Sequence, residues 1–431
     1  MTKQIMSYEE ARNYLNKASK KGIILGLSVI TELLDKLGKP QEGLRIVHIA
    51  GTNGKGSILS YLEQIFLVSG YHTGRYVSPA IGSYENRFLI DGKPVSKELI
   101  CECMEQIREA VDLMEKEGHP LPTVFEIETA MAFLCFRKAR SEVVLLETGM
   151  GGRLDATNVI EKPLLSIIAS VSMDHMAALG PNLTSIAKEK AGIIKEGRDT
   201  LLYPKNPPEV EEVIRQEAGL KKSHLYEIPM DSVRIKEEGT EGSIFSYRHY
   251  PKLSIHLPGQ HQIFNAAVAV EAIQILKKWF CISEFHVEEG LRRTRWSARL
   301  EKISEKPLIY LDGAHNIDGA RALARFLKEH FQGRKILAVM GVLADKEYDK
   351  IAAQVLPMAA ETAVITPDNP RALQSSVLKE TALQYCSNVT DAGTPKEGLA
   401  WLKQEAHPED VGIVFGSLSF MDQLGTKAKM A

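Results

Sequence analysis

The sequence predicts an α/β protein with a large, mostly parallel sheet, a small antiparallel sheet and a second, smaller α/β domain. Short β-branched apolar runs that end in glycine alternate with stretches of helical apolar spacing. This alternation favours parallel strands joined by helical crossovers. The alternation stops after about residue 225 and later begins again, which is typical of two domains in a chain of 431 residues.

The N-terminal half supplies the first series of strands and helices. Ser7 and Glu10 spell a capping box ahead of apolar residues at helical spacing, which predicts a first helix. The run LRIVHIAG at 44–51 is short, apolar and bounded by glycine, which predicts a buried strand, and 57–70 has helical spacing. Further strands are expected over 73–80, 141–152 and 164–175, and further helices over 125–136 and 184–194.

The pattern changes in the middle of the chain. Residues 232–259 contain short apolar runs between turn residues, which predicts small antiparallel strands. A helix is expected over 265–280, and the following stretch, 292–303, is rich in arginine and poor in apolar periodicity. We place the domain boundary there, which gives domains of residues 1–297 and 298–431. The second domain, expected to be Rossmann-like, has candidate strands over 307–316, 335–346, 362–370 and 411–420.

Composition limits the class of protein. The formal net charge is −2 and no long basic block occurs, which argues against nucleic acid as the main partner. The five cysteines are scattered and odd in number, so they do not indicate a disulfide framework or a zinc site. Neither a signal peptide nor a membrane-spanning run is apparent, and we expect a cytoplasmic protein without a membrane partner.

The stretch GTNGKGS is a candidate phosphate-binding loop between a strand and a helix. It departs from the usual spelling because Gly56, not a hydroxyl residue, follows Lys55. Glycines let backbone N–H groups turn toward an anion, and the next helix presents its N-terminus to the same charge. Lys55 would reach terminal phosphates and Ser57 would bind Mg²⁺. A plain strand-to-helix turn is the alternative, but the lysine, the hydroxyl and the context favour a P-loop ATPase-like domain.

Other polar residues stand where strands end or helices begin. Glu147 lies at a strand end and could bind Mg²⁺, and His175 could be a ligand or an acid–base group. Taken alone, however, each is better explained as a solvated surface residue. Asp312 and His315 flank small residues that allow a close approach to a ligand. Asn265 begins a helix, where a simple capping role is the alternative.

Eight motifs occur in order, namely HIAGTNGKGS, ETGMGGRLDATN, SMDH with LG, IAKEKAGI, LPGQHQIFNAA, SARLE, LDGAHN and GVLADKEY. Their order and spacing resemble the folylpolyglutamate synthase and dihydrofolate synthase family, within the Mur ligase superfamily. The resemblance covers the chain from about Tyr8 to Leu424. In that superfamily the phosphate loop is spelled G-T-N-G-K-[GST], which accounts for Gly56.

The resemblance implies roles for residues of the first domain. Lys55, His175 and Lys190 would be catalytic, and Asn265 would meet the adenine end of ATP. A carbamate on Lys190 would support a second Mg²⁺, although the charge pattern alone does not distinguish this lysine from its neighbours. The ATP phosphates would be held by Gly51, Thr52, Asn53, Gly54, Lys55, Gly56 and Ser57. The two magnesium sites would be lined by Ser57, Ser78, Glu147, His175 and carbamylated Lys190.

The resemblance also implies a reaction and its substrates. Arg299, Asp312 and His315 of the second domain would reach an ATP molecule lying between the domains. ATP would convert a folate carboxylate to an acyl phosphate, and the amine of L-glutamate would then form the amide. The partners would be a reduced folate, L-glutamate and ATP, and the chain would be a monomer. Ala80 and Ile81 stand where many relatives have histidine and leucine, which affects substrate choice more than reaction type.

Four alternative functions each require a different feature of the sequence. A bifunctional enzyme would also make dihydrofolate from dihydropteroate. A UDP-muramoyl amino-acid ligase would need an extra N-terminal domain, for which the position of Gly51 leaves no room. A nucleotide switch protein would need a guanine-reading N-K-x-D motif in a suitable place, and none is found. A non-catalytic folate-binding relative is disfavoured because the catalytic lysines, Glu147 and His175 are all present.

Overall fold

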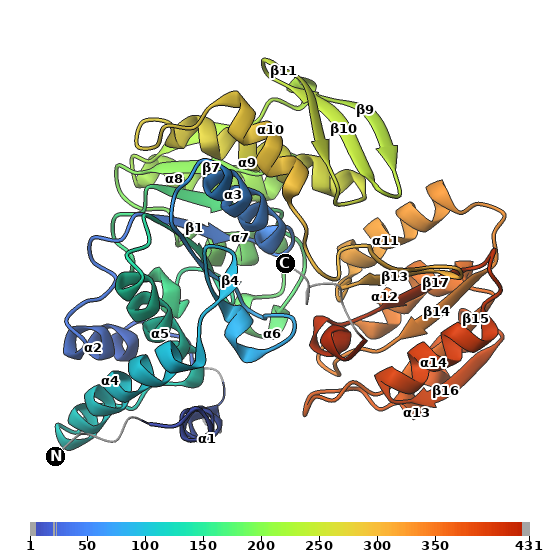
Figure 1. The fold of residues 1–431 in the computed structure, drawn as a ribbon, viewed down its shortest axis with the longest axis horizontal. Helices are drawn as coiled ribbons and strands as arrows, with labels where there is room; N and C mark the ends of the chain where they lie inside the picture. The colour runs from blue at the N-terminus through green and yellow to red at the C-terminus, as the bar shows by residue number, and fades with distance from the viewer. Residues whose placement is uncertain (1–5, 20–21, 23, 425–431) are drawn as a thin grey trace. The chain divides into compact units, whose positions relative to one another are not determined.

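The computed structural model describes residues 6–19, 22 and 24–424, and their contacts divide into two compact units (Figure 1). Unit 1 comprises Met1–Ala80, Tyr84–Asp231 and Asn265–Leu291. Unit 2 comprises Ile81–Ser83, Ser232–Phe264 and Arg292–Ala431. The chain therefore passes between the units more than once, and the single boundary at residue 297 stays a prediction.

Unit 1 is built on an eight-stranded sheet with the order β4-β3-β2-β5-β1-β6-β7-β8. All neighbours from β2 to β8 in this order are parallel, and β3 and β4 extend one edge in antiparallel fashion. The central strand β1 is buried throughout, as its apolar sequence predicts. The strands are β1 Ile46–Ala50, β2 Thr73–Tyr76, β3 Phe88–Ile90, β4 Lys93–Pro94, β5 Val143–Glu147, β6 Leu165–Ile168, β7 Asp199–Leu202 and β8 His224–Glu227.

Helices pack on this sheet, and the apolar side chains buried between helices and sheet form the hydrophobic cores of the unit. The capping box of α1 is present, because the Ser7 N–H donates to Glu10 Oε2 at 2.8 Å and the Glu10 N–H to Ser7 Oγ at 3.2 Å. Gly290 lies so close to α3 that a β-carbon on it would stand 2.6 Å from the Cα of Ile65. The helices are α1 Tyr8–Ser19, α2 Ser28–Lys36, α3 Lys55–Val68, α4 Lys97–Lys116, α5 Val124–Lys138, α6 Met176–Leu179, α7 Leu183–Ala191, α8 Pro208–Leu220, α9 Gln260–Leu276 and α10 Glu284–Arg293.

Unit 2 contains a three-stranded antiparallel sheet, β11-β10-β9, and a six-stranded sheet, β12-β13-β17-β14-β15-β16. In the larger sheet β12 is antiparallel to β13 and the other pairs are parallel. The strands are β9 Val233–Gly239, β10 Gly242–Tyr247, β11 Tyr250–Ile255, β12 Glu301–Glu305, β13 Leu308–Asp312, β14 Ile336–Met340, β15 Glu361–Ile365, β16 Val389–Gly393 and β17 Val411–Phe415. The helices are α11 Ile317–His330, α12 Tyr348–Val355, α13 Ser375–Ala382 and α14 Pro395–Glu405.

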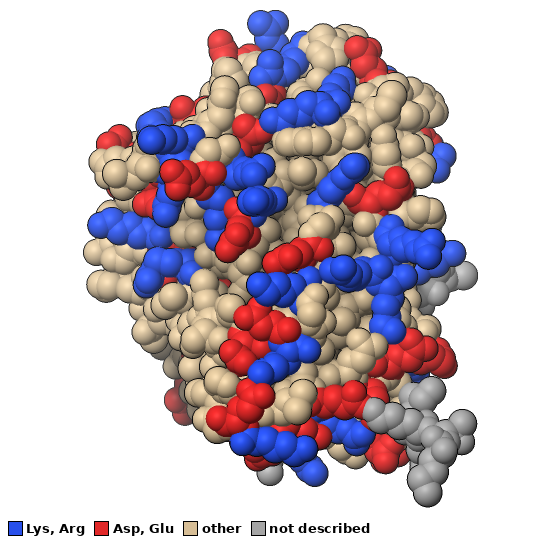
Figure 2. All heavy atoms as spheres, turned by 90° about the vertical axis from the view of Figure 1, so that its left-hand side faces the viewer, with Lys and Arg blue, Asp and Glu red and all other residues tan. Residues whose placement is uncertain are grey.

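The predicted fold class is confirmed: a large sheet dominated by parallel pairs, a small antiparallel sheet and a C-terminal α/β unit. The short 3₁₀ helices are η1 Tyr84–Arg87, η2 Ala156–Val159, η3 Met230–Ser232, η4 Leu356–Met358 and η5 Leu418–Leu424. Among the described residues, no helix is both long and apolar enough to cross a membrane. On the face drawn in Figure 2, acidic and basic side chains are interspersed, in keeping with the near-zero net charge of the chain.

Candidate functional site

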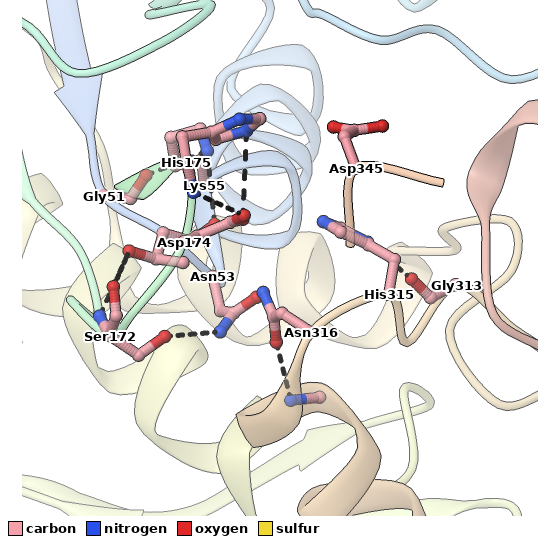
Figure 3. Close-up of polar contacts among 12 residues, drawn as sticks. Gly51, Asn53, Lys55, Ser172, Asp174, His175, Gly313, His315, Asn316 and Asp345 are labelled. Carbon is pink, nitrogen blue, oxygen red and sulfur yellow. Dashed lines mark hydrogen bonds and ion pairs between the residues drawn. The ribbon is translucent and has the colours of Figure 1, made fainter. Parts of the chain in front are cut away.

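The candidate site of unit 1 lies at the carboxyl ends of three adjacent strands. Strand β1 lies between β5 and β6, so the residues that follow these strands meet at one edge of the sheet. The phosphate loop follows β1, Glu147 ends β5, and the segment leading to His175 follows β6. Figure 3 shows the loop residues together with Asp174 and His175. Residues more than a hundred positions apart thus form one site.

Two glycines of the loop are required by close contacts. Gly51 has φ 157°, and a β-carbon there would stand 2.7 Å from the β-carbon of Ala169. Gly54 has φ 87°, and a β-carbon would stand 2.6 Å from Asn265 Oδ1. Because L side chains rarely adopt these backbone angles, both positions favour glycine. The second contact also brings Asn265 of α9 beside the phosphate loop.

The first part of the loop is bonded to the segment after β6. The N–H groups of Thr52 and Asn53 donate to Ser170 O at 2.7 and 3.2 Å. The Thr52 hydroxyl donates to Ser172 O at 3.0 Å and accepts from the Ser172 N–H at 3.1 Å. Asn53 Nδ2 also donates to Ser172 Oγ at 3.3 Å (Figure 3). These two backbone N–H groups therefore already have carbonyl partners.

The second part of the loop is the start of α3. Lys55, Gly56 and Ser57 form its first turn, where backbone N–H groups have no partner within the helix. A helix N-terminus of this kind attracts phosphate through these N–H groups and the helix dipole. Ser57 is only 2% exposed, so its hydroxyl lies within the unit rather than on its surface. The geometry supports an anion site at the start of α3.

Lys55 lies over the loop that it follows. Its Nζ donates to Gly51 O at 2.9 Å and to Thr52 O at 3.3 Å, and stands 3.7 Å from Glu147 Oε1. Its side chain is 14% exposed and that of Glu147 is 9% exposed. A mostly buried ammonium held by carbonyls and one carboxylate is well placed to exchange these partners for phosphate oxygens.

Asp174 and His175 form a tight turn before α6. His175 has φ 49°, and its N–H donates to Asp174 Oδ1 at 2.8 Å. Its Nε2 stands 3.9 Å from Asp174 Oδ2 (Figure 3). A histidine in this left-handed conformation is uncommon, and such residues occur often at functional sites.

Lys190 is the buried lysine of the set. It lies on α7 and is 4% exposed. The pKa of Lys190 is lowered to about 7, mainly by burial and also by the nearby charge of Lys55, whereas Asp174 and Asp155 act in the opposite direction. At neutral pH a large fraction of this amine is therefore uncharged, which is the nucleophilic form.

Asp155 positions the loop that packs against Lys190, a role that the sequence did not reveal. Its Oδ2 accepts the Met150 N–H at 2.8 Å, and its Oδ1 accepts the N–H and hydroxyl of Thr157 at 3.0 and 2.6 Å. In the same loop a β-carbon on Gly152 would stand 2.9 Å from the Lys190 carbonyl oxygen. The motif LDATN contains this aspartate, but a motif alone does not specify its partners.

Ser78 and its neighbours lie at the end of β2. The Ser78–Pro79 peptide bond is cis, and Arg87 Nη1 donates to Ser78 Oγ at 3.4 Å. The same arginine stands 3.3 Å from Glu128 Oε2, a carboxylate buried in α5. Ser78 therefore has a charged partner next to a strand end, and its expected contact with Mg²⁺ stays a prediction.

The predicted residues of unit 2 are brought together by β13. Asp312 Oδ2 accepts the Leu300 N–H and Oδ1 accepts the Ala314 N–H, each at 2.9 Å. Burial raises the pKa of Asp312, and the Arg299 guanidinium opposes this. His315 Nδ1 lies 2.8 Å from Gly313 O, so Nδ1 carries the proton that is donated to this carbonyl. Asp312 and His315 thus fix backbone turns.

The donor set of unit 1 is compatible with Mg²⁺, which prefers oxygen ligands and keeps several waters. Among the described residues, triads of histidine and acidic side chains close enough to share an ion are Glu32–Glu117–His119 and Glu238–Glu329–His330, and neither contains Glu147 or His175. A metal at the strand ends would therefore draw on the carboxylate of Glu147, a hydroxyl and phosphate oxygens, with His175 in a supporting position.

Comparisons with known proteins match both parts of the chain. A family described as "Mur ligase middle domain" matches residues 49–273, and one described as "Mur ligase, glutamate ligase domain" matches residues 298–418. The dihydrofolate synthase/folylpolyglutamate synthase of Bacillus subtilis is 33% identical, with 98% of this chain and 99% of the relative covered.

Solved structures match over the same length. The folylpolyglutamate synthase of Mycobacterium tuberculosis complexed with ADP superposes with a TM-score of 0.88 at 28% identity, covering 97% of this chain and 98% of the other. Escherichia coli FolC in complex with DHPP and ADP gives a TM-score of 0.86 at 27% identity, covering 98% of each chain. The likeness therefore extends over both units and is not confined to the motifs.

Proposed function

Because the chain belongs to the folylpolyglutamate synthase and dihydrofolate synthase family of Mur ligases, we propose that the strand-end residues of unit 1 carry its ATP-dependent chemistry. The chain is an ATP-dependent ligase that adds L-glutamate to folate. The proposal is supported by the 3.7 Å approach of Lys55 to Glu147 at one sheet edge, and by a buried Lys190 that lies close enough for the charge of Lys55 to lower its pKa.

The first step transfers a phosphoryl group. A carboxylate oxygen of the folate attacks the γ-phosphorus of ATP, the bond to the β–γ bridging oxygen breaks, and an acyl phosphate and ADP result. The attacked phosphoryl group carries dispersed negative charge, which fixed positive groups stabilise. We assign this stabilisation to Lys55 and the first-turn N–H groups of α3, after Lys55 leaves the Gly51 and Thr52 carbonyls.

The second step forms the amide. The neutral amine of L-glutamate attacks the acyl carbon, the carbon–oxygen bond to phosphate breaks, and the amine loses a proton. Asp174 and His175 lie at the sheet edge with side chains 10% and 37% exposed, so the imidazole of His175 remains reachable by solvent or a ligand. We assign His175 to this region as a metal ligand or a proton acceptor, as the sequence predicts.

Magnesium and a lysine carbamate complete the proposed site. Bound Mg²⁺ would neutralise phosphate charge and orient the phosphoryl group. Glu147, Ser57 and Ser78 would hold it, and Glu147 would then lose its ion pair with Lys55. The lowered pKa of Lys190 leaves a large fraction of the amine without a proton at neutral pH, and the uncharged amine is the form that adds to carbon dioxide. The resulting carbamate would place an anion where a lysine would repel metal.

The nucleotide contacts of the remaining residues are also proposals. Asn265 Oδ1 lies beside Gly54, which suits a residue that borders a bound nucleotide. Arg299, Asp312 and His315 are assigned to the nucleotide on the strength of the family pattern, and their clustering in unit 2 supports a common role. We also expect a monomer, which sedimentation analysis would test.

A second activity is supported by the names of the relatives. The Bacillus subtilis relative is named for both dihydrofolate synthase and folylpolyglutamate synthase activities. We therefore keep dihydropteroate as a second candidate acceptor for L-glutamate. Ala80 and Ile81 distinguish this chain from many relatives near the expected pterin site, so the acceptor has to be measured.

The experiment measures ADP release by the purified chain with ATP, Mg²⁺ and L-glutamate. Parallel reactions contain tetrahydrofolate, 5,10-methylenetetrahydrofolate or dihydropteroate, and a Lys55→Met variant serves as the control for contaminating ATPase. Turnover with folates alone indicates a dedicated polyglutamate synthase. Turnover with dihydropteroate as well indicates the bifunctional enzyme. ADP release that is absent with all three acceptors would contradict the proposed function.

A further inference from the structure

The hydroxyl of Thr52 is used for hydrogen bonds within the protein rather than for an anion. Thr52 stands inside the phosphate loop, yet its hydroxyl is engaged twice by the backbone of one residue, Ser172. A hydroxyl has one proton to donate, and that proton is given to the Ser172 carbonyl. Its acceptor capacity is used in part by the Ser172 N–H. The single proton of the Thr52 hydroxyl is therefore already donated to a protein group.

Ser172, the residue bonded to Thr52, lies on the segment that leads to Asp174 and His175. Ser172 is 7% exposed and lies two residues before Asp174. The backbone N–H groups of Thr52 and Asn53 bond Ser170 O, and the isolated bridge Asn53↔Ser170 continues the same contact. Figure 3 shows the Ser172 side chain directed at Asn53, with Asp174 and His175 drawn above them. The two loops are therefore tied at successive residues.

We propose that Thr52 is a positioning residue that sets the phosphate loop against the Asp174–His175 segment and so couples nucleotide binding to metal binding. The inference rests on the proposed function, in which the phosphate loop holds the nucleotide and His175 lies at the metal. A shared Mg²⁺–nucleotide complex needs both loops at a fixed separation, because small misplacements of a reacting group are costly. Neither the loop motif nor its spacing assigns this role to the threonine.

The test uses Thr52→Val, which keeps the shape of the side chain but removes the hydroxyl. Metal-free ADP affinity should stay within about twofold, because the first-turn N–H groups of α3 are untouched. The Mg²⁺ concentration for half-maximal rate should rise about fivefold or more, and kcat should fall about tenfold. Thr52→Ser restores a hydroxyl and should recover most of both losses.

Thr73→Val is the matched control. Thr73 is fully buried in the same unit, and its hydroxyl has no hydrogen-bond partner. The same substitution there removes the same atom without untying the loops, so kcat and the Mg²⁺ dependence should remain unchanged. Thermal unfolding of all variants separates loss of fold from loss of coupling.

A double variant sharpens the result. If Thr52 positions His175, the effect of His175→Ala on the Mg²⁺ requirement should be smaller in the Thr52→Val background than in the wild type. Strict additivity would overturn the coupling. Equal losses of metal-free ADP affinity and kcat in Thr52→Val would instead make the threonine a direct nucleotide ligand and overturn the proposal.

Failure of the proposed function would be seen separately. If the wild type releases no ADP with any folate acceptor, the ratio of ADP affinities with and without Mg²⁺ still reports coupling between the loops. A ratio that is the same in the wild type and Thr52→Val would contradict the positioning role, whatever the acceptor.

Discussion

The strand ends of the two units carry similar residues but use them differently. In unit 1, Lys55 and Glu147 stand 3.7 Å apart, and Lys190 is buried nearby with a pKa lowered to about 7. In unit 2, both carboxylate oxygens of Asp312 accept backbone N–H groups, and His315 Nδ1 donates to a carbonyl. The charged side chains of the unit 1 site lie close to one another, whereas the Asp312 and His315 side chains of unit 2 form hydrogen bonds with the backbone.

This difference teaches that position at a strand end does not by itself define a role. Side chains that face one another change partners when a ligand arrives, so their replacement should affect turnover more than stability. Side chains that hold a turn contribute to the free energy of unfolding, because removing a partner leaves buried N–H groups unsatisfied. Five measurements test this contrast, from the largest expected effect to the smallest.

Replacing Lys55 should give the largest loss of turnover. Lys55→Met removes a charge assigned to the transferred phosphoryl group, and we expect kcat to fall about a thousandfold. The free energy of unfolding should also fall, by about 1–3 kcal/mol, because Lys55 and Glu147 are mostly buried and the carboxylate loses its cation. This loss is smaller than the roughly 4 kcal/mol that a thousandfold fall in kcat represents. Steady-state kinetics and urea unfolding measure the two quantities. A large loss of stability with modest loss of turnover would reverse the contrast between the units.

Replacing Lys190 should lower turnover about a hundredfold, and Lys188→Met on the exposed side of the same helix is its control. With a pKa of about 7, roughly nine tenths of the amine is protonated at pH 6 and roughly nine tenths is neutral at pH 8. Carbamate formation should therefore increase with pH across this window. Carbon-13 NMR after addition of labelled bicarbonate would detect the carbamate, and wild-type activity independent of bicarbonate would argue against it.

The same pKa shift predicts a pH-dependent stability. The unfolded chain binds a proton on this lysine up to its ordinary pKa, near 10.4, whereas the folded chain releases it above about 7. The free energy of unfolding should therefore rise with pH between these values in the wild type. In Lys190→Met this contribution should vanish, provided that the wild type is measured without bicarbonate.

Replacing Asp312 should affect stability as well as turnover. An asparagine offers one carbonyl oxygen for two backbone N–H groups, so one of them loses its acceptor. We expect Asp312→Asn to lower the free energy of unfolding by about 1–3 kcal/mol. Urea unfolding and the KM for ATP are the measurements. Unchanged stability with damaged nucleotide use would place Asp312 among the residues that face a ligand.

The smallest effect concerns His48, buried in β1 two residues before the strand ends. Burial lowers the pKa of His48 to about 3, and its Nε2 lies 2.8 Å from the Thr157 hydroxyl. On acidification the unfolded chain takes up a proton near pH 6.5 and the folded chain does not, so stability falls. The loss at pH 5 is about 2 kcal/mol. His48→Val should lack this slope in urea unfolding, whereas His224→Val, at an exposed histidine, should keep it.

Local patterns predicted the scaffold well. The strand expected over 44–51 is β1, and the helix expected over 57–70 is α3, which begins two residues earlier because Gly54 adopts a left-handed conformation and caps it. The helix expected from residue 265 begins at Gln260, directly after the left-handed Gly259. Such differences are small because glycine and apolar spacing act over a few residues.

The partners within the site were beyond the reach of the sequence. The motif predicted backbone N–H groups turned toward an anion, but those of Thr52 and Asn53 bond Ser170, which lies well over a hundred residues away. Likewise, the charge pattern did not single out Lys190, whose lowered pKa arises from burial and from the charge of Lys55. Burial and long-range hydrogen bonds depend on the whole fold, so they are not encoded in any one motif.

The close contact between Gly290 and Ile65 means that a substitution at a glycine would affect the phosphate loop. Ile65 lies on α3 ten residues after Lys55, or about 15 Å along the helix. A β-carbon at position 290 would stand 2.6 Å from the Ile65 Cα, so a larger residue has to displace the backbone of one of the two helices. Movement of α3 would be carried along its axis to the phosphate loop. A substitution or an inhibitor that separates α3 from α10 would therefore change nucleotide affinity without occupying the nucleotide site.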